Sequence, residues 1–372
     1  MLRSIGAGSI ALLLTAGCGG TAPSGTRLLA GGAIELGEAQ AGEEVAFEIP
    51  SGTSGFSLTV EALDGGADTA IGVEELRDPS GAVLVRAFED IAASNGPLLG
   101  PRGAGVGAVR VPLVDDRAGV PLPSGRWVVK PGGNVGGGKS GSAAAYGGRV
   151  RLSLRLAEAA ASRVLDVDLY LPAGMSAAPG DAALGARLDI AFGLLDRLFS
   201  VGRGELRYHS IEARHAVLSS QTAIDEANRA ADSVSAGAAA QIVLTQELSP
   251  DGGVLSGVSN CLPGAIGVLG TPCSAVIVAL RSDEEPWMVG AAMAHELGHF
   301  MGLNHSTEFD GLADTLADTP SCSDTSKDGL ARCPDRNNLM FPSVNTASGA
   351  EALWASPTQR AVVQSSPLLR AR

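Results

Sequence analysis

The sequence is poor in basic and aromatic residues. Its 372 residues include 27 lysines and arginines against 40 aspartates and glutamates, which gives a net charge of −13, and only 4% are aromatic. This balance speaks against nucleic acid as a partner, because phosphates are neutralised by clustered lysines and arginines. Fifty glycines indicate many turns and packing of small residues. The length allows two domains.

The apolar run near the N-terminus, residues 5–16, is too short for an ordinary transmembrane helix. It follows the positive charge of Arg3, as in an export signal. The run ends in Leu-Thr-Ala-Gly-Cys at residues 14–18. This resembles a bacterial lipoprotein signal, although Thr15 stands where that motif prefers Leu. The resemblance implies a signal over residues 1–18, a tether over 19–27, and lipidation of Cys18.

A lipidated Cys18 would anchor the protein outside the cytoplasm to a bacterial membrane, and we expect the outer one. The alternative is a plain secretory signal with a chance cysteine, so that the protein is secreted. Both interpretations predict export.

Cysteines are few, and none shows the tight Cys-x-x-Cys spacing typical of cysteine zinc sites. An even number besides Cys18 favours disulfides in an exported chain. Three pairings are possible. Joining nearest neighbours would close two loops, Cys261 with Cys273 and Cys322 with Cys333.

Residues 28–158 alternate between apolar and polar side chains, as in Val45, Phe47 and Ile49. The same alternation recurs over residues 149–156, so we expect half-buried strands with one wet face. No amphipathic helix interrupts the series, and the pattern predicts an N-terminal β-sandwich. Residues 132–148 are nearly all small, and we expect a flexible loop there.

From about residue 160 to residue 372, strands alternate with helices, which predicts an α/β domain. Leu165 to Leu171 alternate as a strand, and Asp181 can cap a helix that reaches Leu198. Two apolar stretches, 242–244 and 275–280, predict further strands.

Three of the five histidines lie within residues 295–305, which read His-Glu-Leu-Gly-His-Phe-Met-Gly-Leu-Asn-His. Pro286, with Ser282 or Asp283 as a cap, predicts the start of a helix that runs to about residue 301. On this helix His295 and His299 are four residues apart, so both imidazoles project from one face. His209 and His215 lack such a context, and we expect ordinary strand or surface roles for them.

Gly302 can end the helix and turn the chain sharply, which lets His305 return as a third ligand. Three imidazoles leave the fourth position of Zn²⁺ open for water, as in catalytic rather than structural sites. Glu296 then stands where it can take the proton of that water as a general base. The sequence therefore predicts a hydrolytic zinc site.

The spacing His-Glu-x-x-His-x-x-Gly-x-x-His at 295–305, followed by Met340 within Asn-Asn-Leu-Met-Phe-Pro at 337–342, resembles the metzincins. The resemblance implies a mixed twisted sheet, an active-site helix and a Met-turn in which Met340 forms an apolar floor beneath the zinc. It implies a zinc-dependent endopeptidase that cuts proteins or peptides. Pro342 stands where some relatives carry a metal-reaching Tyr, so that ligand is lacking.

Asp318-Thr319-Pro320, together with residues 302–305 and 338–340, resembles the pappalysin-like branch of the cytophagalysin type. The resemblance covers roughly residues 160–370, and it implies a C-terminal helix after residue 356. Some relatives bind Ca²⁺ near the site, and hard oxygen ligands are dense here. No EF-hand spacing is present, and the alternative is a solvated acidic segment. The carboxylates concerned are Glu308, Asp310, Asp314, Asp318, Asp324, Asp328 and Asp335.

Two other functions compete with the peptidase. A surface binding or adhesion lipoprotein could keep a structural zinc site without turnover, although such a site would not require Glu296. A glycosidase would need a defined carboxylate pair, and none stands out beyond the general acidity.

Overall fold

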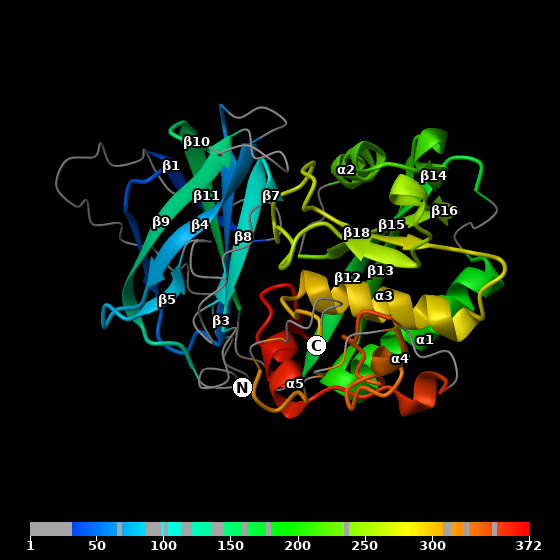
Figure 1. Cartoon of the computed structure of the whole chain (residues 1–372). Helices are drawn as coiled ribbons and strands as arrows, with labels where there is room; N and C mark the ends of the chain where they lie inside the picture. The colour runs from blue at the N-terminus through cyan, green and yellow to red at the C-terminus, as the bar shows by residue number, and fades with distance from the viewer. Residues whose placement is uncertain are drawn as a thin grey trace, which may run out of the picture.

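The computed structural model shows two β-rich parts side by side, and the α-helices of the described residues all lie in the second (Figure 1). The predicted signal and tether, with Cys18, lie outside the described residues. The structure describes residues 32–64, 69–86, 98–99, 103–112, 121–135, 144–157, 162–175, 180–233, 238–307, 314, 316–320, 322, 324, 327–343 and 348–372.

The N-terminal part consists of two sheets. One has the order β1-β11-β3-β8, and the other has the order β10-β9-β4-β5-β6 with β2 beside β9 and β7 beside β4. The strands are β1 (Ile34–Gln40), β2 (Val45–Ile49), β3 (Gly55–Ala62), β4 (Thr69–Arg77), β5 (Val83–Arg86), β6 (Leu98–Leu99), β7 (Gly103–Ala104), β8 (Val106–Val111), β9 (Gly125–Val135), β10 (Ala144–Ala145) and β11 (Arg149–Ala157).

One hydrophobic core lies between these sheets. Phe56 of β3 packs edge-on against Phe47 of β2 and Trp127 of β9. Leu152 and Leu154 of β11 contribute from the same sheet as β3. The predicted alternation is confirmed in these strands, because every second side chain enters this core.

The prediction of one wet face is wrong for β3. Its outward residues Ser57 and Thr59 are each 1% exposed, and Arg110 on neighbouring β8 is 0% exposed. The reason is that the C-terminal part covers this face. Arg110, for example, donates hydrogen bonds to the Val362 carbonyl and the Ser365 hydroxyl.

The predicted loop over residues 132–148 is too long. Residues 132–135 belong to β9, and Ala144 and Ala145 pair back onto it as β10. The glycine at position 133 allows β9 to lie close to β4, because a Cβ there would lie 2.2 Å from the Ala70 carbonyl oxygen.

The C-terminal part is built on a mixed sheet with the order β13-β12-β15-β18-β17, and β19 adds to β12. β17 and β19 are antiparallel to their neighbours, and the other pairs are parallel. Its strands are β12 (Arg163–Pro172), β13 (Val201–Ile211), β15 (Ala240–Thr245), β17 (Gly257–Ser259), β18 (Val276–Ala279) and β19 (Arg370–Ala371); a separate pair is β14 (Val217–Leu218) with β16 (Glu247–Leu248).

Helices cover both faces of this sheet. α1 and α3 pack on one face, with Leu188, Leu195 and Met293 in the larger core, and α2 packs on the other. The helices are α1 (Ala182–Phe199), α2 (Gln221–Ala230), α3 (Pro286–Phe300), α4 (Lys327–Leu330) and α5 (Pro357–Gln364), with short 3₁₀ turns at Ala213–Ala216, Pro250–Gly252 and Ala350–Ala352. Among the described helices, none combines the length and apolarity needed to cross a bilayer.

The helix starts were predicted with mixed success. Asp181 caps α1 by accepting a hydrogen bond from the Leu184 amide at 2.7 Å, as expected. The predicted cap of α3 by Ser282 or Asp283 is wrong, because the N-cap is Glu285 without a side-chain bond. Pro286 at the first position lacks an N–H, so one fewer donor needs a cap.

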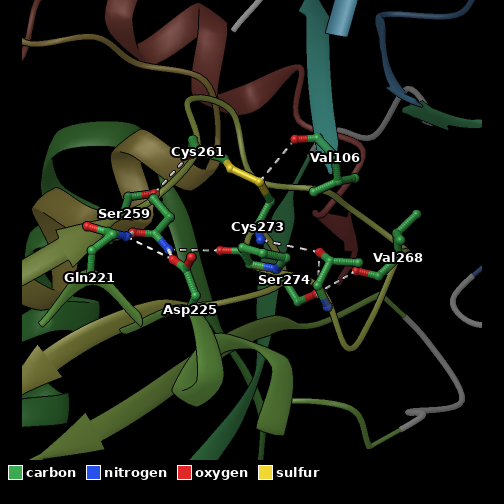
Figure 2. The surroundings of a disulfide bond; sticks show 11 residues. Val106, Gln221, Asp225, Ser259, Cys261, Val268, Cys273 and Ser274 are labelled. Carbon is green, nitrogen blue, oxygen red and sulfur yellow. Dashed lines mark hydrogen bonds between the residues drawn. A yellow bond between two sulfur atoms is a disulfide. The ribbon is translucent and has the colours of Figure 1, made fainter. Parts of the chain in front are cut away.

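Both nearest-neighbour disulfides are formed, Cys261–Cys273 and Cys322–Cys333. Figure 2 shows the first of them beside β8, with Cys273 Sγ 3.5 Å from the Val106 carbonyl oxygen. The loop that it closes therefore lies between the two parts of the chain.

Candidate metal centre

Helix α3, which contains His295 and His299, lies in the interior of the molecule. Every residue from Val289 to Phe300 on it is buried. A Cβ on Gly290 would lie 2.6 Å from Ile190 Cγ2 and 2.9 Å from the Arg187 carbonyl oxygen, so this glycine permits the close approach of α1. This close contact sets the position of α3 relative to α1.

The chain turns directly after α3, as predicted. Gly302 has φ of 101°, a conformation that favours glycine. The amide of Gly302 donates to the His299 carbonyl at 2.8 Å, and the Leu303 amide donates to the Gly298 carbonyl at 3.0 Å. These bonds satisfy the carbonyls of the last helical turn and bring His305 back toward the helix.

The turn brings the three histidines together. His305 Nε2 lies 3.3 Å from His295 Nε2 and 3.0 Å from His299 Nε2. One nitrogen from each ring can be chosen so that all lie within 4.8 Å of one another. Imidazole nitrogens placed at about 2.0–2.1 Å around one tetrahedral ion are about 3.3–3.4 Å apart. The donor set therefore fits one Zn²⁺.

Backbone carbonyls hold two of the rings. His295 Nδ1 lies 2.6 Å from the Leu339 carbonyl oxygen, and His299 Nδ1 lies 2.7 Å from that of Leu303. Because a carbonyl only accepts, each Nδ1 carries the proton and donates it, which leaves Nε2 with a free lone pair. Burial, aided by the neighbouring imidazoles, lowers the pKa of His299 well below 6.5, which favours this neutral form.

Glu296 lies against the edge strand β17. Its residue is 6% exposed, and a Cβ on Gly257 would lie 2.7 Å from Glu296 Cγ and 2.8 Å from Oε1. Burial raises the pKa of Glu296 to about 8 in the absence of a metal ion. A bound dication nearby would lower that pKa, since an opposite charge favours the carboxylate. Metal binding would therefore favour the carboxylate form of Glu296, which a general base needs.

Met340 lies beneath the same turn of α3. It is fully buried, and a Cβ on Gly298 would lie 2.6 Å from its sulfur. The thioether therefore packs on the last turns of the helix that carries His295 and His299.

The carboxylates considered for calcium are engaged within the protein wherever they are described. Asp318 accepts from the Ser356 hydroxyl and the Thr358 amide. Asp335 accepts from the hydroxyls of Ser306 and Thr307. Among the described residues, no group of three or more carboxylates gathers its oxygens as the histidines gather their nitrogens. Glu308, Asp310 and the side chain of Asp328 lie outside the described residues.

The remaining histidines lie elsewhere. His209 on β13 is 3.1 Å from Asp168 Oδ1, and it stacks on Tyr170. His215 is buried near α2, and burial lowers its pKa.

Sequence reasoning gave no role to Gly257 and Gln359, and it used Asn338 only as part of the family resemblance; none of the three belongs to the group of possible metal ligands. A glycine in a short strand and two amide side chains carry no spacing pattern that marks them. The only available signal was the position of Asn338 two residues before Met340.

Two solved structures are similar to this chain over part of its length. Archaemetzincin from Methanopyrus kandleri is 16% identical with a TM-score of 0.32, over 54% of this chain and 94% of that protein. Metalloproteinase-II from Bacteroides fragilis is 16% identical with a TM-score of 0.28, over 47% of this chain and 53% of that protein. No protein-family model and no curated protein matches the chain. Likenesses this distant decide neither fold nor function, and the geometry of the site must do so.

Proposed function

We propose that this protein is a zinc-dependent endopeptidase of the metzincin type, in the pappalysin-like branch. The observation that carries the proposal is the convergence of three imidazole Nε2 atoms, with the buried carboxyl residue Glu296 directly after the first of these histidines on the same helix and outside the group of ligands. A purely structural site would close the fourth position with a further ligand. Among the described residues, no fourth His, Cys, Asp or Glu joins the group.

His295, His299 and His305 would hold the ion. Zinc in such a site supplies a Lewis acid for the scissile carbonyl and lowers the pKa of water to about 7. Glu296 takes the proton from the attacking water and passes it to the leaving amine, so one side chain acts as base and then as acid. No side chain forms a covalent bond to the substrate.

The edge strand β17 offers a place for the substrate backbone. It borders the sheet on one side only, and Gly257 within it contacts Glu296. An extended peptide that pairs with such an edge is held by main-chain hydrogen bonds, which need no particular side-chain sequence. The scissile bond would then lie beside Glu296.

We also propose the division of the chain that the sequence suggests. Residues 1–18 would be a lipoprotein signal that ends at lipidated Cys18, residues 19–27 a tether, 28–158 a β-sandwich domain and 160–372 the peptidase domain. The support is the signal-like run and the change of periodicity near residue 160. The peptidase would then act outside the cytoplasm, anchored to a bacterial membrane.

The experiment compares Glu296→Gln with wild type on casein and on a peptide library read by mass spectrometry. We expect hydrolysis to fall by at least about 100-fold while one zinc stays bound, because only proton transfer is lost. Glu285→Gln is the matched control, since Glu285 is exposed at the far end of the same helix. It should cut like wild type.

Equal cleavage by Glu296→Gln and wild type would remove Glu296 from the mechanism. A zinc-loaded wild type that cuts nothing would favour a surface binding protein instead.

A further inference from the structure

A backbone carbonyl helps to orient His295. His295 Nδ1 donates to the Leu339 oxygen at 2.6 Å, and both residues are buried. Leu339 lies in the loop 337–341, far from α3 in the sequence. Whatever holds this loop in place therefore also orients the first metal ligand.

Side-chain amides hold that loop from inside. Asn338 Oδ1 accepts from the Met340 amide at 2.8 Å, so the Asn338 side chain closes the loop around Leu339. Asn338 Nδ2 donates to Gln359 Oε1 at 2.9 Å, and Gln359 Nε2 donates back to Asn338 Oδ1 at 3.2 Å. The Leu339 amide donates to the Trp354 carbonyl at 2.8 Å.

Gln359 is itself immobilised at the start of α5. Its Oε1 accepts from the Ser356 amide at 2.9 Å, and its own amide donates to Ser356 Oγ at 3.1 Å, which is a capping box. Ser356 Oγ donates to Asp318 Oδ1 at 2.8 Å. Gln359 is 0% exposed, and Asn338 is 2% exposed. Neither amide can exchange its partner for bulk water.

We infer that Asn338 and Gln359 are positioning residues of the metal site, which connect the cap of α5 to the carbonyl that orients His295. The inference rests on the proposed zinc site. The chain of contacts runs from Gln359 to Asn338, to the carbonyl of Leu339 and to the imidazole of His295. Loss of either amide leaves the other with unpaired buried groups, so the loop shifts to recover partners.

A mere contribution to stability is the competing explanation, and α5 offers a matched control for it. Gln364 lies on the same helix, and its Nε2 donates to the Phe199 carbonyl at 3.1 Å. Gln364→Met removes one side-chain hydrogen bond from this helix, whereas Gln359→Met removes the two bonds with Asn338 and the bond from the Ser356 amide. Only the bonds of Gln359 lead to His295, so Gln364→Met controls for the loss of a glutamine bond from α5.

The experiment measures the zinc dissociation constant of the full chain by competition with a chromogenic chelator. Gln359→Met and Asn338→Leu should weaken zinc binding by about 10-fold or more, as for other outer partners of metal ligands. Gln364→Met should leave the constant within about two-fold. The visible spectrum of the cobalt-substituted protein should change for the first two variants and not for the third.

If Gln359→Met does not fold, Gln359→Glu provides the test, because it keeps the acceptor for Ser356 and Asn338 and replaces the donor to Asn338 Oδ1 with a second carboxyl oxygen. It should weaken zinc binding less than Gln359→Met would, but more than Gln364→Met. Unchanged zinc affinity in the folded Gln359 and Asn338 variants, or an equal loss in Gln364→Met, would overturn the inference. A wild type that binds no zinc would instead overturn the proposed function.

Discussion

At the scale of single residues, the candidate site depends on two glycines as well as on its histidines and Glu296. Gly257 has no Cβ, and the carboxylate of Glu296 occupies that space. Gly298 makes the same kind of room for Met340. Both glycines therefore shape the site without chemistry of their own.

Gly257→Ala should reduce hydrolysis by about 100-fold with zinc still bound, because the new methyl group displaces Glu296 by roughly 1 Å. The measurement is kcat/KM on a peptide substrate together with zinc content. Gly253→Ala is the control in the preceding loop, where a Cβ would lie at an ordinary 3.6 Å from the Pro250 carbonyl oxygen. Full activity in Gly257→Ala would contradict the placement of Glu296 against β17.

The clustering of the three histidines could be predicted from the sequence because their geometry is local. His295 and His299 share a helix face by periodicity alone, and Gly302 marks the turn that returns His305. Gly257 and Gln359 reach the site through tertiary packing from positions far away in the chain. No local pattern records that kind of contact.

At the scale of elements, α3 is buried in part because helix α1 packs very closely against it. The Gly290 contact with Ile190 sets this approach, so the position of α3 relative to the sheet depends on one missing methyl group.

Gly290→Ala should lower the free energy of unfolding by about 1–3 kcal/mol through overpacking against α1. Gly193→Ala, on the exposed side of α1 with nothing within 4 Å of its Cβ, should raise it by up to about 1 kcal/mol through helix propensity. Urea unfolding measures both changes. A stabilised Gly290→Ala would show that the two helices do not meet there.

The elements themselves were largely predictable, since β2, β3, β11, β12, α1 and α5 follow their periodicity and caps. The failures have physical reasons. Gly132 and Gly133 were predicted as loop residues because glycine is common in loops. In the structure they belong to β9, where the lack of a Cβ lets the strand lie close to its neighbour β4. The cap of α3 was misplaced because Pro286 makes a side-chain cap less necessary.

At the scale of the whole molecule, the N-terminal part is bound tightly to the C-terminal part. Arg110 on β8 reaches the C-terminal end of α5, where a cation is favourable, and burial lowers the pKa of Arg110 to about 9. A Cβ on Gly55 would lie 2.4 Å from the Ser365 carbonyl oxygen. Arg155 donates to the Pro367 carbonyl at 2.8 Å.

This docking could not be read from the sequence. The alternation in β3 predicted a wet face, since Ser57 and Thr59 are polar. Small polar residues such as Ser and Thr can line a face exposed to water, and they can equally line a face packed against another backbone. Only the tertiary structure distinguishes the two.

The most direct test of the central claim is a zinc titration of the metal-free full chain, with peptide hydrolysis as the readout. Among the described residues, the three histidines are the one group of this kind, so the proposal implies one zinc ion per chain. Chelation should therefore abolish hydrolysis, and added zinc should restore it linearly up to a break at about one equivalent. Hydrolysis that survives complete removal of zinc, or zinc-loaded protein that never cuts a peptide bond, would contradict the account.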